Sequence, residues 1–125
     1  MSEPAVTAHP LEFRIVTGVR PAGVHVLAVH GDADLHTAPE LRERLADAID
    51  TGARTVVLDL TETTFLDSMA LGVMIGALKR MRARDGQLRL VVTRDEVRRI
   101  LEITQLHRVF PLDESLDEAL SSVAD

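Results

Sequence analysis

The sequence predicts a single α/β domain with about four helices, in which a mixed sheet begins with an N-terminal hairpin and continues with parallel βα units. Three observations lead to this fold class. Two strand-like runs at the start are separated by a turn sequence. Later strand-like runs alternate with segments of helical periodicity, which favours parallel strands joined by right-handed crossovers. The length of 125 residues suits one domain with one core.

The predicted domain spans residues 11–123. Residues 1–10 lack a basic segment followed by an apolar one, so no signal peptide is expected. We expect these residues to form a flexible N-terminal tail. Residues 11–16 begin with strict alternation, apolar at odd positions, as in a strand with one wet face. A turn is expected at residues 18–23 and the second strand of the hairpin at residues 25–30.

Three capping-box sequences predict the starts of three helices. They lie at residues 37–40, 93–96 and 115–118, and the first of these helices should end at Gly52. The strands between the helices are expected at residues 55–60, 87–92 and 107–112. The first of these three strands is a nearly continuous apolar run, which is typical of a strand buried on both faces.

A fourth helix is predicted to begin near Ser68. The following residues, 69–78, carry no charge, but this run is too short to span a bilayer, so it indicates a buried helix. Its main apolar stripe should face the sheet and contains Leu71, Met74, Ile75, Leu78 and Met81. Gly72 and Gly76 should allow close backbone approach on a second side. Met69 and Val73 lie off the stripe, either as an exposed patch for a partner or under neighbouring helices.

Ser68 stands where the loop after a buried strand meets the start of a helix. Unpaired backbone N–H groups gather at such a position, and the helix dipole favours anions there. The simplest structural role of Ser68 is that of N-cap, for which Asp67 competes. The loops at residues 31–36 and 61–67 both follow predicted parallel strands. They should lie side by side and form one polar surface around Ser68.

Composition excludes several function classes. Aromatic residues make up 2% of the chain, which argues against stacking of nucleic-acid bases. The net charge of −6 disfavours direct binding to a phosphate backbone. The absence of cysteine removes thiolate chemistry and fits a reducing cytoplasm.

The other candidate residues have weaker signals. Asp32 and Asp34 are explained equally well by turn chemistry and by a functional role. They lack the further ligands that a metal site would need. His36 could act as a base for Ser68 in a hydrolase, but the chain has no nucleophile-elbow sequence around Ser68.

Three segments resemble one family. Residues 65–72 (FLDSMALG), preceded by residues 56–60 (VVLDL), resemble the phosphoacceptor segment of anti-sigma factor antagonists, the STAS domains. Residues 31–41 (GDADLHTAPEL) are similar to the first loop and helix of that family, and residues 86–92 (GQLRLVV) to its following strand. The resemblance covers about residues 11–120, so it implies that the predicted domain at residues 11–123 is a STAS domain.

The resemblance implies a non-enzymatic switch without a cofactor of its own. In this family the unphosphorylated protein binds an anti-sigma factor that is a serine kinase, which releases a sigma factor, and a serine phosphatase reverses the phosphorylation. Ser68 would be the phosphorylated residue. The residues expected to contact the partner are Asp32, Asp34, His36, Thr64, Asp67, Ser68, Met69 and Val73. A cytoplasmic monomer or weak dimer is expected, with no contact to membrane or nucleic acid.

Two alternatives stay open. The chain could be a STAS-like scaffold module of a stress-signalling complex, without turnover at Ser68, or an enzyme that uses Ser68 as nucleophile with His36. Met69 stands where the family usually has Ser or Thr, and Ala70 where it usually has Gly. The first difference leaves Ser68 as the one acceptor hydroxyl at the helix start, and the second makes that start stiffer.

Overall fold

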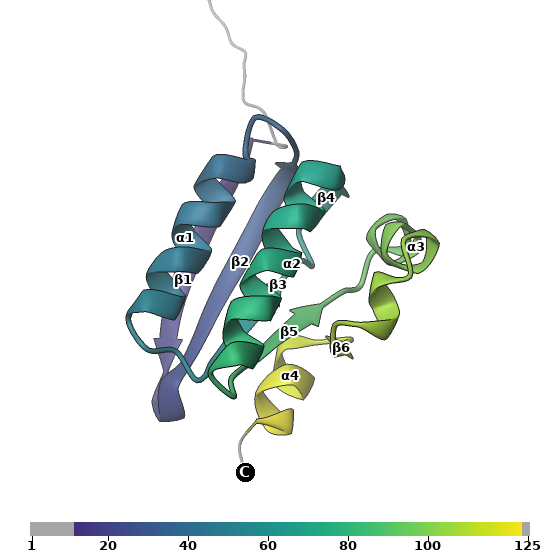
Figure 1. The fold of residues 1–125 in the computed structure, drawn as a ribbon. Helices are drawn as coiled ribbons and strands as arrows, with labels where there is room; N and C mark the ends of the chain where they lie inside the picture. The colour runs from purple at the N-terminus through teal and green to yellow at the C-terminus, as the bar shows by residue number, and fades with distance from the viewer. Residues whose placement is uncertain (1–11, 124–125) are drawn as a thin grey trace, which may run out of the picture.

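The computed structural model describes residues 12–123 and shows a sheet flanked by helices on both faces (Figure 1). Its strands are β1 (Arg14–Arg20), β2 (Val24–Ala33), β3 (Thr55–Asp59), β4 (Thr63–Leu66), β5 (Gln87–Val91) and β6 (Leu112–Asp113). Its α-helices are α1 (Ala38–Asp50), α2 (Ser68–Ala83), α3 (Asp95–Ile103) and α4 (Leu116–Ser122). Single 3-10 turns lie at Pro21–Gly23 and Leu106–Arg108.

The sheet has the order β1-β2-β3-β5-β6, and β4 pairs with the end of β2 that extends past β3. Strand β1 is antiparallel to β2, and all the other strand pairs are parallel. Helices α1 and α2 lie side by side over one face (Figure 1). On the other face, Ala119 of α4 packs with Val24, Val57 and Val91. The predicted fold class, a hairpin followed by parallel βα units with four helices, is confirmed.

The predicted antiparallel hairpin is present, but its strands reach further toward the turn and into the following loop than predicted. Strand β1 continues to Arg20, so the turn shrinks to residues 21–23, where Ala22 and Gly23 have positive φ angles of 66° and 74°. Strand β2 continues to Ala33, through half of the loop predicted at residues 31–36. The loop predicted at residues 61–67 contains β4, which extends the sheet along β2.

Residues 63–66 form a strand because threonine and phenylalanine favour strands and because hydrogen bonds join this segment to β2. The buried Thr63 hydroxyl donates to Val29 O at 2.7 Å, and Gly31 N donates to Glu62 O at 3.0 Å. The register between β2 and β4 shifts between Gly31 and Asp32. Thr63 N also donates to Leu60 O at 3.0 Å, so the hydroxyl and the N–H of this buried residue both have partners.

Only one of the three predicted capping boxes caps its helix as expected. Ser115 Oγ accepts from Glu118 N at 3.0 Å. Thr37 precedes α1, but its hydroxyl bonds to the preceding loop, donating to Asp32 O and accepting from Asp34 N. Helix α3 begins at Asp95, one residue later than the pattern predicts, without a side-chain cap. The predicted strand at residues 107–112 is reduced to β6, because Leu106–Arg108 forms a 3-10 turn.

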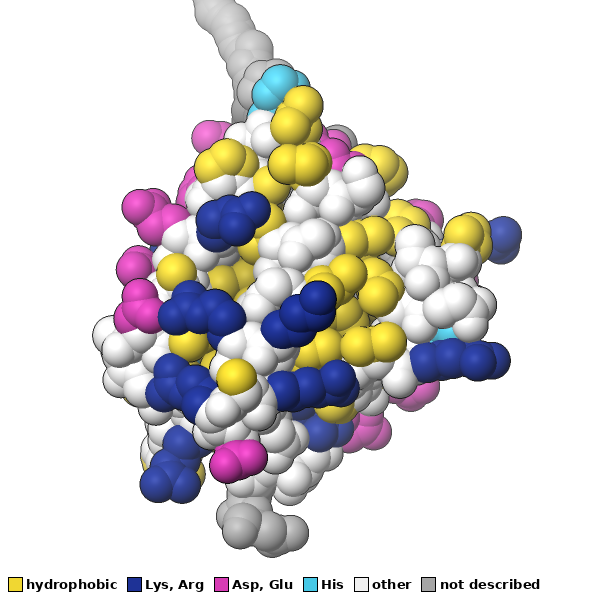
Figure 2. Space-filling view, in the orientation of Figure 1, with side chains coloured by type: hydrophobic (Ala, Val, Ile, Leu, Met, Phe, Trp, Pro, Cys, Tyr) yellow, Lys and Arg dark blue, Asp and Glu magenta, His cyan; other side chains and the backbone are white. Residues whose placement is uncertain are grey.

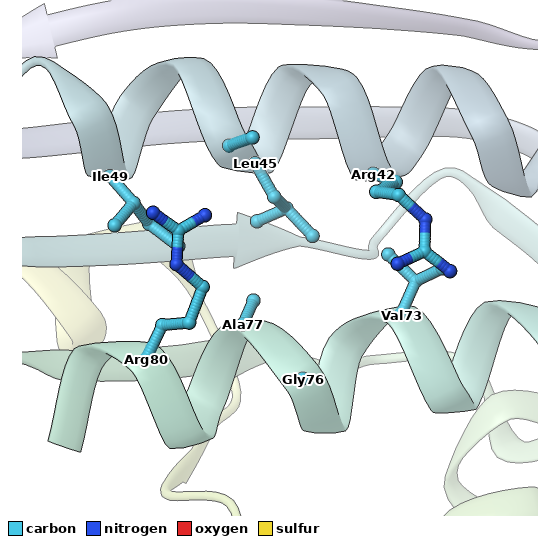
Figure 3. A pocket seen from close by; sticks show the side chains of 8 residues that line it. Arg42, Leu45, Ile49, Val73, Gly76, Ala77 and Arg80 are labelled. Atoms are coloured by element: carbon cyan, nitrogen blue, oxygen red, sulfur yellow. The ribbon is translucent and has the colours of Figure 1, made fainter. Parts of the chain in front are cut away.

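Helix α2 is buried on two sides, which corrects one predicted site residue. The stripe residues Leu71, Met74, Leu78 and Met81 are buried as predicted, and Ile75 packs at its margin. Val73 is only 5% exposed, so its predicted place in a partner-binding patch is wrong. It points toward α1, where it lines a shallow groove of about 90 Å³ with Leu45, Ile49 and Ala77, between Arg42 and Arg80 (Figure 3).

Gly72 and Gly76 do not serve close helix packing. Both are exposed, and a Cβ atom added at either position would meet nothing within 4 Å. The predicted close backbone approach is therefore wrong. Gly72 instead leaves the helix surface without a side chain one turn after Ser68, which keeps that surface flat.

Candidate functional site

Ser68 is the first residue of α2, and Asp67 is its N-cap. Asp67 Oδ1 accepts a hydrogen bond from Ala70 N at 3.0 Å, so of the two candidate caps the structure uses Asp67. Ser68 is exposed, and none of the hydrogen bonds seen within residues 12–123 involves its hydroxyl. The hydroxyl thus lies at a solvent-facing helix start, where the helix dipole favours negative charge.

The two predicted loops do meet at this helix start. Asp67 N donates to Ala33 O at 3.1 Å, and Leu35 N donates to Asp67 Oδ2 at 2.8 Å. The parallel pairing of β2 and β4 causes this, because it brings the ends of both strands to the same edge of the sheet. The predicted polar surface around Ser68 is therefore built from residues 32–37 and 64–68.

Asp34 shapes its own loop. Its Oδ1 accepts from His36 N at 2.9 Å and from Thr37 N at 3.2 Å, which is the Asx-turn geometry considered from the sequence. Asp32 is joined to the neighbouring strand, since its Oδ1 accepts from the Thr64 hydroxyl. Asp32, Thr64 and Asp34 are thus held in fixed positions on the surface next to Ser68.

Three large apolar side chains are exposed on the loop, strand and helix that meet at the start of α2, and we call them the apolar rim. They are Leu35, Phe65 and Met69, with 57%, 45% and 46% of their surface exposed. Figure 2 shows hydrophobic side chains exposed at the end of the molecule where α2 begins. Exposed apolar groups gathered beside polar ones mark interaction sites on soluble proteins.

Sequence reasoning found Met69 but missed Leu35 and Phe65. Phe65 carried a usable signal: in a strand, consecutive side chains point to opposite faces, so Phe65 and Leu66 lie on different faces, and one of them is exposed wherever only one face is covered. This signal depends on recognising residues 63–66 as a strand. Leu35 carried no comparable signal, because its exposure follows from the turn that Asp34 forms.

The arrangement of His36 gives no support to a hydrolase. His36 is exposed, and its hydrogen bond to Asp34 is made by its backbone N–H. Within residues 12–123, no hydrogen bond joins His36 to Ser68, and no group of three or more His, Cys, Asp or Glu could hold a metal ion.

None of the helices described for residues 12–123 has the length and apolar character needed to span a membrane.

Comparison with known proteins gives consistent matches over most of the chain. The family model for the STAS domain matches residues 16–119. An anti-sigma-B factor antagonist from Staphylococcus aureus is 32% identical over 89 residues, which are 71% of this chain and 82% of the relative. One from Listeria monocytogenes is 36% identical over 84 residues, which are 67% of this chain and 74% of the relative.

A solved structure has the same fold over nearly the whole length. The crystal structure of an anti-sigma factor antagonist from Mycobacterium paratuberculosis superimposes with a TM-score of 0.84 and 28% identity. The match covers 94% of this chain and 99% of that protein. With the sheet order, the four helices and the serine at the start of α2, these matches show that the chain belongs to the STAS domain family.

Proposed function

We propose that the protein is an anti-sigma factor antagonist controlled by phosphorylation of Ser68. In its unphosphorylated form it binds an anti-sigma factor that is a serine kinase, and this binding releases a sigma factor. The observation that carries the proposal is the exposed Ser68 hydroxyl at the start of α2, with the apolar rim on the segments that meet there. The relatives named as anti-sigma factor antagonists support the same function.

The surface has the composition that a protein partner needs. The apolar rim supplies area that can be removed from water, at about 25 cal/mol per Å². Asp32, Asp34, His36 and Thr64 provide polar groups beside it for orientation, and Asp67 holds the two loops together. The partner therefore contacts Ser68, Met69 and both loops, and Val73 lies beneath this surface as part of the core.

The phosphoryl transfer requires only an accessible hydroxyl from this chain. A bond forms between Ser68 Oγ and the γ-phosphorus of ATP held by the kinase, while the bond from that phosphorus to the β,γ-bridging oxygen breaks and ADP leaves. The hydroxyl proton passes to a base of the kinase. A serine phosphatase reverses the step with water, which releases inorganic phosphate. ATP and its magnesium belong to the kinase, and this chain performs no catalysis.

Phosphorylation switches binding off by changing the charge of the surface. A phosphate adds about −1.5 to −2 charges at neutral pH. The start of α2 tolerates this charge, because backbone N–H groups and the helix dipole favour an anion. A partner that covers the neutral hydroxyl and the apolar rim would have to desolvate the dianion, which costs far more than the ~1 kcal/mol of an ordinary hydrogen bond.

The test of the proposal is the variant Ser68→Ala. It should fold, capture the kinase from a lysate of the source cell, and take up no phosphate when the captured kinase and ATP are added, as read by mass spectrometry. Ser115→Ala is the matched control, because Ser115 also stands at a helix start but its hydroxyl caps that helix. Phosphate found on Thr64 or Ser115 of the Ser68→Ala protein would reject the assignment. Tight binding without phosphate transfer to the wild type would favour the scaffold alternative.

Asp34→Asn should weaken kinase binding or slow phosphorylation while changing the free energy of unfolding by less than about 0.5 kcal/mol. Asparagine keeps the Oδ1 acceptor that Asp34 presents to His36 N and Thr37 N, so it removes the charge and retains the turn. Binding assays and urea denaturation measure the two effects separately. Asp34→Ala, which removes the turn as well, is the comparison. Normal phosphorylation of Asp34→Asn would show that Asp34 acts only through the turn.

A further inference from the structure

The carboxylate of Asp67 joins two segments that are far apart in the sequence. One oxygen, Oδ1, accepts from Ala70 N at 3.0 Å and caps α2. The other, Oδ2, accepts from Leu35 N at 2.8 Å, across a separation of 32 residues. The helix start that carries Ser68 and the loop that carries Leu35 are therefore bound to the same side chain.

Capping α2 does not by itself require a carboxylate. Ser115 caps α4 with a single hydroxyl oxygen, which accepts from Glu118 N at 3.0 Å. Asparagine is also a good N-cap, but it has one acceptor oxygen, whereas aspartate has two. The second oxygen of Asp67 is thus the feature that capping leaves unexplained, and its partner is the backbone of an exposed apolar residue, Leu35.

We propose that Asp67 is a positioning residue through which the state of Ser68 sets the position of the Leu35 loop, a role that rests on the proposed function of Ser68. In the unphosphorylated protein, Asp67 holds Leu35 against the start of α2, so that Leu35 and Met69 border the same hydroxyl. The docking surface is then formed before the partner arrives, which lowers the entropy cost of binding.

Phosphorylation acts on this link through both charge and competition. The phosphate lies one residue from the Asp67 carboxylate, and two anions so close repel each other. The phosphate oxygens also compete for the N–H groups of the first turn of α2, one of which, Ala70 N, is bound by Asp67. When Asp67 turns away from Ala70 N, Leu35 N loses its acceptor and the Leu35 segment separates from the helix start, while the bond from Asp67 N to Ala33 O keeps the base of the loop in place.

The loop itself should stay folded while it separates. Asp34 Oδ1 accepts from His36 N and Thr37 N, and these bonds lie within the loop and do not involve Asp67. The Thr37 amide therefore serves as an internal reference. Leu35 N should respond to the state of Ser68, and Thr37 N should respond much less.

The experiment compares four proteins, in which the wild-type Asp67 or the substitution Asp67→Asn is combined with serine or phosphoserine at position 68. Phosphoserine is installed by genetic code expansion, so no kinase is needed. Amide hydrogen exchange and amide chemical shifts of Leu35, Ala70 and Thr37 are measured by NMR. In the wild-type background, phosphoserine should speed exchange at Leu35 by at least about tenfold, the lower bound for losing a hydrogen bond to a charged group.

The variant Asp67→Asn tests the route of the effect. It should speed exchange at Leu35 by a similar factor with unmodified Ser68, and phosphoserine should then add little. The proposal would be overturned if phosphoserine left amide exchange at Leu35 unchanged in the wild type, or if it changed that exchange equally in Asp67→Asn. Should Asp67→Asn fold poorly, Asp67→Ser retains an oxygen for Ala70 N and none for Leu35 N, and the same comparison applies.

These outcomes are distinct from a failure of the proposed function. Absence of any kinase that modifies Ser68 would reject the functional proposal, yet it would leave the measured dependence of Leu35 on Asp67 and phosphoserine unchanged. Conversely, a phosphorylation switch at Ser68 that works equally well in Asp67→Asn would leave the function in place and remove Asp67 from it.

Discussion

Met69→Lys should abolish binding to the kinase partner while the domain remains folded. Met69 is the second residue of α2, is 46% exposed and lies next to Ser68 in the apolar rim. A lysine there would place an ammonium group in a contact that excludes water, and an unpaired charge in such a contact is very costly. We expect the affinity to fall by at least about 30-fold, which corresponds to the ~2 kcal/mol of a binding hot spot.

The same substitution should have little effect on stability. Met69 is 46% exposed, so replacing its side chain disturbs little packing. A cation in the first turn opposes the helix dipole and lowers the stability by about 0.3–1 kcal/mol. Ala83→Lys, at the exposed far end of α2, controls for added charge. Val73→Lys is the contrasting variant and should unfold the domain, since Val73 is buried. If Met69→Lys binds normally, or if it unfolds like Val73→Lys, Met69 is not a contact residue.

Val73 shows where single-helix reasoning fails. The spacing of apolar residues identified the face of α2 that lies on the sheet, and this face is buried as predicted. Periodicity within one helix cannot show that a second helix, α1, lies alongside and buries Val73 and Ala77 as well. The order of neighbours across the sheet decides this, and it depends on pairings between segments distant in sequence.

At the candidate site, the start of α2 shows the same limit of predictions made from one segment of the sequence. The sequence indicated that Ser68 begins a helix and that two loops meet there, because both conclusions depend on local patterns and on parallel pairing. It did not indicate that Asp67 binds Leu35 N, or that Thr37 turns its hydroxyl toward Asp32 O and Asp34 N. A capping pattern predicts only local partners, whereas a polar side chain takes whichever partner the tertiary structure brings within reach.

Among single substitutions of charged residues, Asp113→Asn should destabilise the domain most. Asp113 Oδ2 accepts from Arg89 Nε at 2.8 Å and Asp113 Oδ1 from Arg89 Nη2 at 3.0 Å, a bidentate pair. The two side chains are 4% and 17% exposed, on the face of the sheet that α4 covers. The hydrogen bond to Asp113 is the main cause that raises the pKa of Arg89 above its ordinary value.

The expected loss in the free energy of unfolding follows from the positive charge that Arg89 retains in the Asp113→Asn variant. Its guanidinium stays charged at any pH at which the protein folds, so Asp113→Asn leaves a largely buried cation without its anion. Breaking a buried pair in this way costs about 3–5 kcal/mol, and the partial exposure of Arg89 places the expected value near the lower end, about 3 kcal/mol. Urea denaturation followed by far-UV circular dichroism measures the loss directly.

The exposed pair Arg80–Asp50 provides the matched control. Its atoms approach to 2.7 Å, as close as those of the buried pair, but its side chains are 51% and 66% exposed. Asp50→Asn should therefore cost less than about 1 kcal/mol, because water solvates either charge when the other is removed. Equal losses for Asp50→Asn and Asp113→Asn would mean that burial does not set the strength of the Arg89 pair. A much larger loss for Asp113→Asn would show that burial makes the ion pair between β5 and β6 the stronger of the two.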